Sequence, residues 1–233
     1  MENNKKFRHE IKYLCNHIQL AVIQSRLKAI MKLDPHATMG QYTVRSMYFD
    51  DYENRCYTEN ESGVDPREKF RIRIYNSNDK RITLECKRKE KGKTHKTSCR
   101  ITKFEFESIL NGAPLYQAHC QSELLTKFIT LTKTRLFTPS VIVEYERVPY
   151  VYTLGNVRIT LDRNIRSSSD FSHFFEENIK TRQILPKGQH LLEVKYDEFL
   201  PEFIKEVLQL GELQQTTFSK FYLCKKYSME EKS

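Results

Sequence analysis

KFRIRIY, residues 69–75, decides the fold, because basic and apolar side chains alternate along its whole length. Successive side chains of a β-strand point to opposite faces of the sheet. Phe70 and Ile72 therefore share one face, whereas Arg71 and Arg73 share the other. The stretch predicts a strand with one apolar face and one strongly basic face.

The same alternation returns after a short interval, over residues 81–89. Here Ile82 and Leu84 alternate with Glu85 and Lys87. The intervening NSND at 76–79 is typical of a hairpin turn. A third basic segment, 93–101, follows the next turn, so three neighbouring antiparallel strands are predicted.

Periodicity predicts the remaining elements on both sides of these strands. Helical spacing alternates with further strand-like segments, and nothing between them marks a domain boundary. We therefore expect an α+β protein with one domain over residues 1–233, built on an antiparallel, meandering sheet. The expected strands are 7–14, 44–49, 140–147, 157–162 and 191–196, and the expected helices are 17–33, 102–110, 122–131, 202–210 and 219–227.

Composition narrows the class of partner. Among the 233 residues, 39 Lys and Arg face 30 Asp and Glu, which gives a net charge of +9. This excess favours anionic partners, whether nucleic acid, acidic lipid or phosphorylated small molecules. The sequence carries no RRM or zinc-finger pattern, and we expect no nucleic-acid partner.

The cysteines and the hydropathy pattern predict a location. The six cysteines are scattered without C-x-x-C spacing, so we expect reduced thiols rather than disulfides or a zinc site. The chain shows neither a secretory signal at its start nor an apolar run long enough to cross a membrane. These features predict a cytoplasmic protein without a membrane segment of its own.

The basic strand faces allow two interpretations. In the first, the apolar faces form the inside of a barrel and the basic faces are solvated, which is the commoner arrangement. In the second, helices cover outward apolar faces and the basic faces line the interior. Residues 87–103 contain eight Lys and Arg side chains against one acid, Glu90. This imbalance favours the second interpretation, because a basic interior is costly unless it holds a polyanion.

Two acids share these basic faces. Glu10 and Glu193 would be unfavourable beside phosphates unless a divalent cation lay between them, and Mg²⁺ or Mn²⁺ suits carboxylate and phosphate oxygens. The alternative for Glu193 is a simple ion pair with Lys195 or an arginine.

A series of short segments recurs in a recognisable order along the chain: RHEIKY (8–13), SMYFD (46–50), KFRIRIY (69–75), LECKRK (84–89), YER (145–147), VRITLD (157–162), LEVKY (192–196) and SKF (219–221). This series resembles the VTC domain, the polyphosphate polymerase domain of the vacuolar transporter chaperone family. That domain belongs to the triphosphate tunnel metalloenzymes and also occurs in stand-alone bacterial proteins. The likeness extends over residues 5–227.

The resemblance implies a closed antiparallel barrel of eight strands, a triphosphate tunnel with a basic interior and peripheral helices. It also implies a metal-dependent phosphotransferase that adds the terminal phosphate of ATP to polyphosphate, with Mn²⁺ or Mg²⁺. Glu193 and Glu10 would hold the metal. Arg71, Arg73, Lys195 and Lys220 would act in catalysis. The phosphate ligands would be Lys12, Arg55, Arg71, Arg73, Lys87, Lys96, Arg147, Arg158, Lys195 and Lys220.

The expected partners follow from the same resemblance: ATP, polyphosphate, triphosphate and pyrophosphate. Arg8 stands where the wider superfamily has the first Glu of a Glu-x-Glu-x-Lys opening, which weakens a purely hydrolytic interpretation. Hydrolysis of tripolyphosphate or a nucleoside triphosphate remains an alternative, as does a non-catalytic polyphosphate-binding module. A membrane-protein partner and the oligomeric state stay open.

Overall fold

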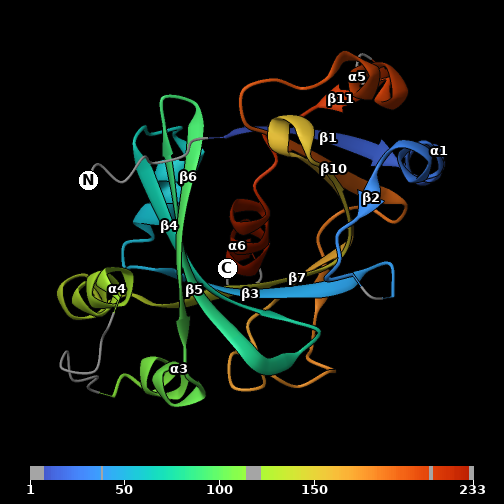
Figure 1. The fold of residues 1–233 in the computed structure, drawn as a ribbon. Helices are drawn as coiled ribbons and strands as arrows, with labels where there is room; N and C mark the ends of the chain where they lie inside the picture. Colours follow the sequence, from blue (N-terminus) through green and yellow to red (C-terminus); the bar gives the residue numbers. More distant parts are fainter. Residues whose placement is uncertain (1–7, 38, 114–121, 210–211, 231–233) are drawn as a thin grey trace.

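The computed structural model describes residues 8–37, 39–113, 122–209 and 212–230. It contains one large antiparallel sheet with helices around it, which confirms a mixed α and β protein (Figure 1). The helices are α1 (His17–Ile30), α2 (Arg55–Glu61), α3 (Lys103–Leu110), α4 (Glu123–Thr134), α5 (Glu202–Leu208) and α6 (Lys220–Glu230). The strands are β1 (His9–Asn16), β2 (Lys32–Leu33), β3 (Tyr42–Asp50), β4 (Arg67–Tyr75), β5 (Asn78–Glu90), β6 (Lys93–Ile101), β7 (Thr138–Tyr152), β8 (Val157–Ser168), β9 (Arg182–Gln183), β10 (Gln189–Tyr196) and β11 (Gln214–Gln215).

Eight longer strands follow one another through the sheet in the order β1-β10-β8-β7-β3-β4-β5-β6. The expectation of a closed eight-stranded barrel is nevertheless wrong, because no ladder joins β6 to β1 among the described residues. Instead β11 occupies the edge of β1, pairing with Tyr13 and Leu14. The two ends of the sheet meet at one isolated bridge, where Arg8 N donates to Thr94 O at 3.3 Å.

The hairpin between β4 and β5 sets the register of the basic strands. Tyr75 pairs with Asn78, and the two turn residues Asn76 and Ser77 have φ values of 50° and 51°. Positive φ at both central residues matches the right-handed twist of the adjoining strands. The register shifts between Arg73 and Tyr75, and this irregularity together with the turn places Arg71 opposite Glu85 on one face of the sheet.

Helices cover the apolar outer face of the sheet. Under α3 and α4, Phe70 and Ile72 of β4 join a buried cluster with Phe106 and Phe128. Under α1 and α5, apolar residues of β1, β8 and β10 form a second cluster with Leu27. The basic faces therefore point to the concave side, which we call the inner face. The second of the two interpretations of the strand pattern is the one the structure shows.

One helix departs from the expected peripheral arrangement. Figure 1 shows α6 enclosed by the curve of the sheet. Phe221 and Cys224 of this helix are buried, and the Phe221 ring lies 5.1 Å from that of Tyr48, which projects from the inner face of β3. Apolar packing against inward tyrosines draws α6 inside, where its first residue, Lys220, reaches the basic groups.

Short elements account for the other differences. The helix expected over 17–33 ends at Ile30, and α2 stands where a turn-rich connection was expected. The buried carboxylate of Asp50 accepts hydrogen bonds from the backbone N–H groups of Cys56 and Tyr57, which stabilises the N-terminus of α2.

The five cysteines within the described ranges are free thiols, and Cys120 lies outside those ranges. Over the same ranges, every helix is too short or too polar to span a bilayer.

Candidate functional site

The first cluster on the inner face is built around Glu85 of β5. Its Oε2 accepts from Arg71 Nε at 2.7 Å, and Lys96 Nζ lies 3.1 Å from its Oε1. Arg73 Nη1 lies 3.8 Å away. Burial alone would raise the pKa of Glu85, but the three cations hold it well below its usual range. Glu85 is therefore an anion that three predicted phosphate ligands share.

Two inner-face tyrosines complete this cluster. Arg71 Nη1 donates to the hydroxyl of Tyr48 at 2.8 Å, and Arg73 Nη2 donates to that of Tyr145 at 3.4 Å. These contacts fix the planes of both guanidinium groups. A guanidinium with a fixed plane is suited to binding two oxygens of one phosphate.

A second cluster surrounds Asp162 of β8. Arg147 binds its carboxylate with two parallel hydrogen bonds of 2.7 and 2.8 Å, and Lys220 Nζ lies 2.7 Å from Oδ2. Burial opposes ionisation of Asp162, yet Arg147 and Lys220 outweigh it and lower its pKa. Lys220 Nζ also lies 4.7 Å from the centre of the Tyr145 ring, which joins the two clusters.

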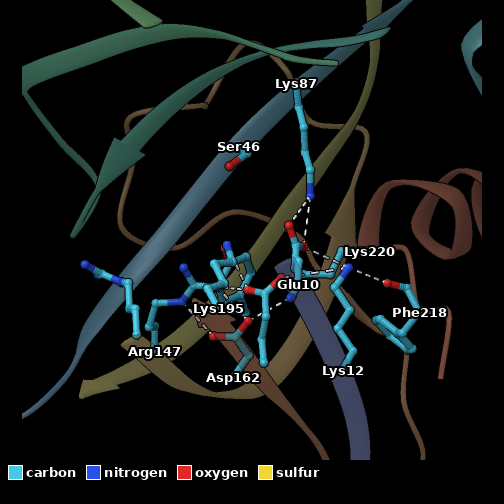
Figure 2. Close-up of polar contacts among 12 residues, drawn as sticks. Glu10, Lys12, Ser46, Lys87, Arg147, Asp162, Lys195, Phe218 and Lys220 are labelled. Carbon is cyan, nitrogen blue, oxygen red and sulfur yellow. Dashed lines mark hydrogen bonds and ion pairs between the residues drawn. The ribbon is translucent and has the colours of Figure 1, made fainter. Parts of the chain in front are cut away.

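The third cluster contains both predicted metal ligands. Glu10 accepts from Lys87 Nζ at 2.7 Å (Figure 2). Glu193 lies 3.3 Å from Lys195 Nζ. Lys12 Nζ lies 3.4 Å from Glu10 and 3.9 Å from Glu193. The pairing of β1 with β10 creates this arrangement, because it sets Glu10 opposite Lys195 and Lys12 opposite Glu193.

Glu10 and Glu193 influence each other's ionisation within this cluster. Burial would raise the pKa of Glu193, but Lys195 and further lysines lower it well below its usual range. Glu10 is also shifted downward, by Lys195 and Lys87 against its burial. Both groups are thus ionised at neutral pH.

A hard divalent cation fits this pair of acids in its donor chemistry. Adjacent carboxylate oxygens are what Mg²⁺ and Mn²⁺ prefer, and Mg²⁺ sites commonly take one or two carboxylates with phosphate oxygens completing the shell. Within the described ranges no three His, Cys, Asp or Glu side chains are grouped to hold a metal. Glu10 and Glu193 could therefore hold a metal together with ligands from a phosphate or from water.

Two predicted phosphate ligands stand apart from these clusters. Arg158 lies on the inner face opposite Lys195, but its guanidinium binds Asp34 at 2.6 Å and the Tyr42 hydroxyl at 3.0 Å. Arg55 begins α2, is half exposed and pairs with Glu53. It lines an outer pocket of about 280 Å³ rather than the inner face.

Sequence reasoning did not assign the acids and tyrosines that bind the cations. Glu85 stood in the alternating pattern 81–89, on the same face as Lys87, and Asp162 closed the segment 157–162. Their positions were therefore visible, but which cation each would bind depends on strand order. Tyr48 and Tyr145 lie on inner faces that only the observed register identifies.

Comparisons with known proteins bear on the family and the fold of the chain. The model of the family described as VTC domain matches residues 7–228. No curated protein matches the sequence. A solved structure from Bacillus halodurans, provisionally described as an adenylate cyclase, is similar at 14% identity and a TM-score of 0.53, over 91% of this chain and 95% of that one. A Pyrococcus horikoshii protein is similar at 14% identity and a TM-score of 0.51, over 97% and 99%. At such identities the two structures support the fold alone.

Proposed function

Because the chain belongs to the VTC domain family, we propose that it binds a chain of phosphates on its inner face and transfers the terminal phosphate of ATP to polyphosphate. One observation carries the proposal. All of the predicted phosphate ligands except Arg55 gather on the concave side of a single curved sheet, Lys220 from the enclosed helix α6 and the others from strands far apart in sequence. Such convergence of cations is suited to a ligand with several closely spaced negative charges.

The mechanism we propose is electrostatic. Arg71, Arg73 and Arg147 bind phosphate oxygens with fixed guanidinium planes and keep the reacting groups in line. Lys195 and Lys220 neutralise charge that spreads over the transferred phosphoryl group. No covalent protein nucleophile is required, since the acceptor is the end of a phosphate chain.

Entry of phosphate into this site is an exchange of partners. In the empty protein Arg71 is bound to Glu85 and Arg147 to Asp162. A phosphate oxygen must replace a carboxylate oxygen on each arginine, which leaves the acid to its remaining lysine. Lys96 and Lys220 are placed to retain Glu85 and Asp162 during that exchange.

Glu193 and Glu10 would hold a divalent cation, Mn²⁺ or Mg²⁺, against the phosphates. When bound, such an ion supplies positive charge between phosphate oxygens. Lys12, Lys87 and Lys195 keep both carboxylates ionised, so that they could bind such an ion.

Hydrolysis of tripolyphosphate or a nucleoside triphosphate is the second candidate. One observation favours it: the Lys96 side chain is 51% exposed, so the edge of the Glu85 cluster is open to water although Glu85 itself is buried. A site open to water permits attack by water as well as by a phosphate chain.

The test is incubation with ATP and Mn²⁺ or Mg²⁺, with products resolved on a polyphosphate gel and orthophosphate assayed in parallel. A ladder of phosphate polymers that is lost in Glu193→Gln supports the polymerase. The matched control is Glu68→Gln, which removes an acid from the outer face, where Glu68 pairs with Lys127. Orthophosphate without polymer identifies a hydrolase. Phosphate binding without either product contradicts both reactions and leaves a binding module.

A further inference from the structure

The cationic rows of the inner face continue past the residues assigned above. Register sets Lys69 of β4 opposite Lys87 of β5, and Arg67 opposite Lys89. Like charges directly opposite each other destabilise a sheet. This end of the β4–β5 ladder therefore carries two unfavourable pairs in succession, next to the turn between β5 and β6.

Lys69 differs from the assigned cations of the inner face in its partners. Each of those cations lies within ion-pair distance of a carboxylate. Lys69 Nζ instead donates to Asn60 Oδ1 and to Ser219 Oγ, and lies 5.4 Å from the Phe221 ring centre. Among described residues, no carboxylate forms an ion pair with it.

The surroundings of Lys69 make this charge costly. Burial lowers its pKa to about 7, and the charges of Lys87, Arg67 and Lys12 act in the same direction. A buried cation among other cations is stabilised by an anion brought from outside. Lys12 Nζ is likewise directed to this end of the site, since it donates to Phe218 O at 2.8 Å.

Arg67 and Lys89 show a similar lack of counter-charges. Arg67 Nη1 donates to the carbonyl of Val64 at 2.7 Å. Both residues are half-buried and take the same strand face as Lys69, and Arg67 also borders the outer pocket beside Arg55. In the part of the chain that the structure describes, neither forms an ion pair.

We infer that Arg67, Lys69 and Lys89 form an extension of the phosphate site, over which a linear inorganic polyphosphate passes from the clusters of the inner face to the rim beside the β5–β6 turn. The inference rests on the proposed function. Cations on one strand face recur about every 7 Å. That repeat suits a flexible anion that is charged along its whole length, whereas a single phosphate would engage only one step of it.

The same rim carries Lys91 in the turn and Lys93 at the start of β6, both exposed. A chain leaving the extension therefore meets charged rather than apolar surface, with Glu90 and Asp65 lying beside these lysines. ATP and tripolyphosphate, in contrast, are short enough to be held by the assigned clusters alone. Chain length consequently decides whether the extension is used.

The experiment compares Lys69→Gln and Lys89→Ala with the wild-type protein, by calorimetric titration with tripolyphosphate and with a long-chain polyphosphate. The glutamine introduced by Lys69→Gln retains an amide that can donate to Asn60 or Ser219, which protects the fold. Lys103→Ala is the matched control, because it removes one exposed cation that pairs with Asp79 on the outer side.

We expect Lys69→Gln to weaken long-chain binding roughly tenfold and Lys89→Ala roughly fivefold, with tripolyphosphate affinity nearly unchanged. Long-chain affinities equal to wild type in both variants overturn the inference. Equal losses for both ligands, or equal loss in Lys103→Ala, also overturn it, since they indicate only a general effect of net charge. Failure of the wild type to bind either ligand is a different result and refutes the proposed function.

Discussion

Glu85 and Asp162 determine the electrostatic state of the inner face. Each is nearly inaccessible to solvent and binds cations that would otherwise repel one another. An interior of unpaired positive charge was expected from the strand pattern, on the argument that only a polyanion could stabilise it. The structure shows instead that internal acids neutralise most of these cations, and that Lys69 is where the original argument still applies.

Lys69 gives a prediction for the pH dependence of stability. Its pKa falls from an ordinary 10.5 to about 7 on folding. Between those values the unfolded chain binds a proton that the folded protein lacks, so the free energy of unfolding rises with pH through this window. The destabilisation is complete below about pH 7.

Lys69→Gln should therefore be more stable than wild type near neutral pH, with the difference shrinking toward pH about 10. Urea unfolding of both proteins across this range measures it. A difference that does not change with pH would show that Lys69 keeps an ordinary pKa in the folded protein.

Individual residues also show how far the site could be predicted from the sequence. Alternation along 69–75 correctly assigned Arg71 and Arg73 to one face, because the strand period is a local property. The partner of each cation depends on register between strands such as β5 and β6, which no local pattern contains. Arg55 illustrates the limit, since it lies in a helix that the sequence did not predict.

Among the helices and strands, α6 both packs against the sheet and supplies a side chain to the site. Its first residue, Lys220, binds Asp162, while the ring of Phe221 packs on Tyr48 and beneath Lys69. A helix over 219–227 was predictable from periodicity. Its place inside the sheet was not, because its pattern of apolar residues fits an inward or an outward position equally.

Replacing Phe221 tests this placement. Phe221 is 2% exposed, so Phe221→Ala should lower the free energy of unfolding by about 3–5 kcal/mol through lost burial and the cavity that remains. Phe199, which is 56% exposed, gives the control, and Phe199→Ala should change stability by no more than about 0.5 kcal/mol. Urea denaturation distinguishes them, and equal effects would contradict a buried α6.

For the whole molecule, the long strands were predictable and the way they end was not. The eight main strands carry strong alternation or long apolar runs, whereas the two-residue β11 has no signal of its own. Yet β11 occupies the edge of β1 and leaves the sheet unclosed apart from the bridge at Arg8. The edge of the sheet at β1 is thus occupied by β11, the element with the least signal in the sequence.

Ligand binding should stabilise the molecule as a whole. At about 100 times its dissociation constant, tripolyphosphate adds about 2.7 kcal/mol, which raises the unfolding midpoint of a chain this size by roughly 5–10 °C. Thermal scans with tripolyphosphate, against sulfate at matched ionic strength, measure the shift. A midpoint that responds equally to both salts would contradict a specific phosphate site.

The pairing of Arg71 with Glu85 and of Arg147 with Asp162 makes the empty protein resemble an ion exchanger supplied in its internal-salt form. Such a material binds an anion only when another cation pairs with the acid that the anion displaces. A buried carboxylate that loses its arginine keeps Lys96 or Lys220, and a proton or a metal ion that enters with the phosphate would offset the cation it has lost. Phosphate should therefore bind together with protons or divalent cations, so that the charge of the site changes little. Without either, phosphate should bind only weakly.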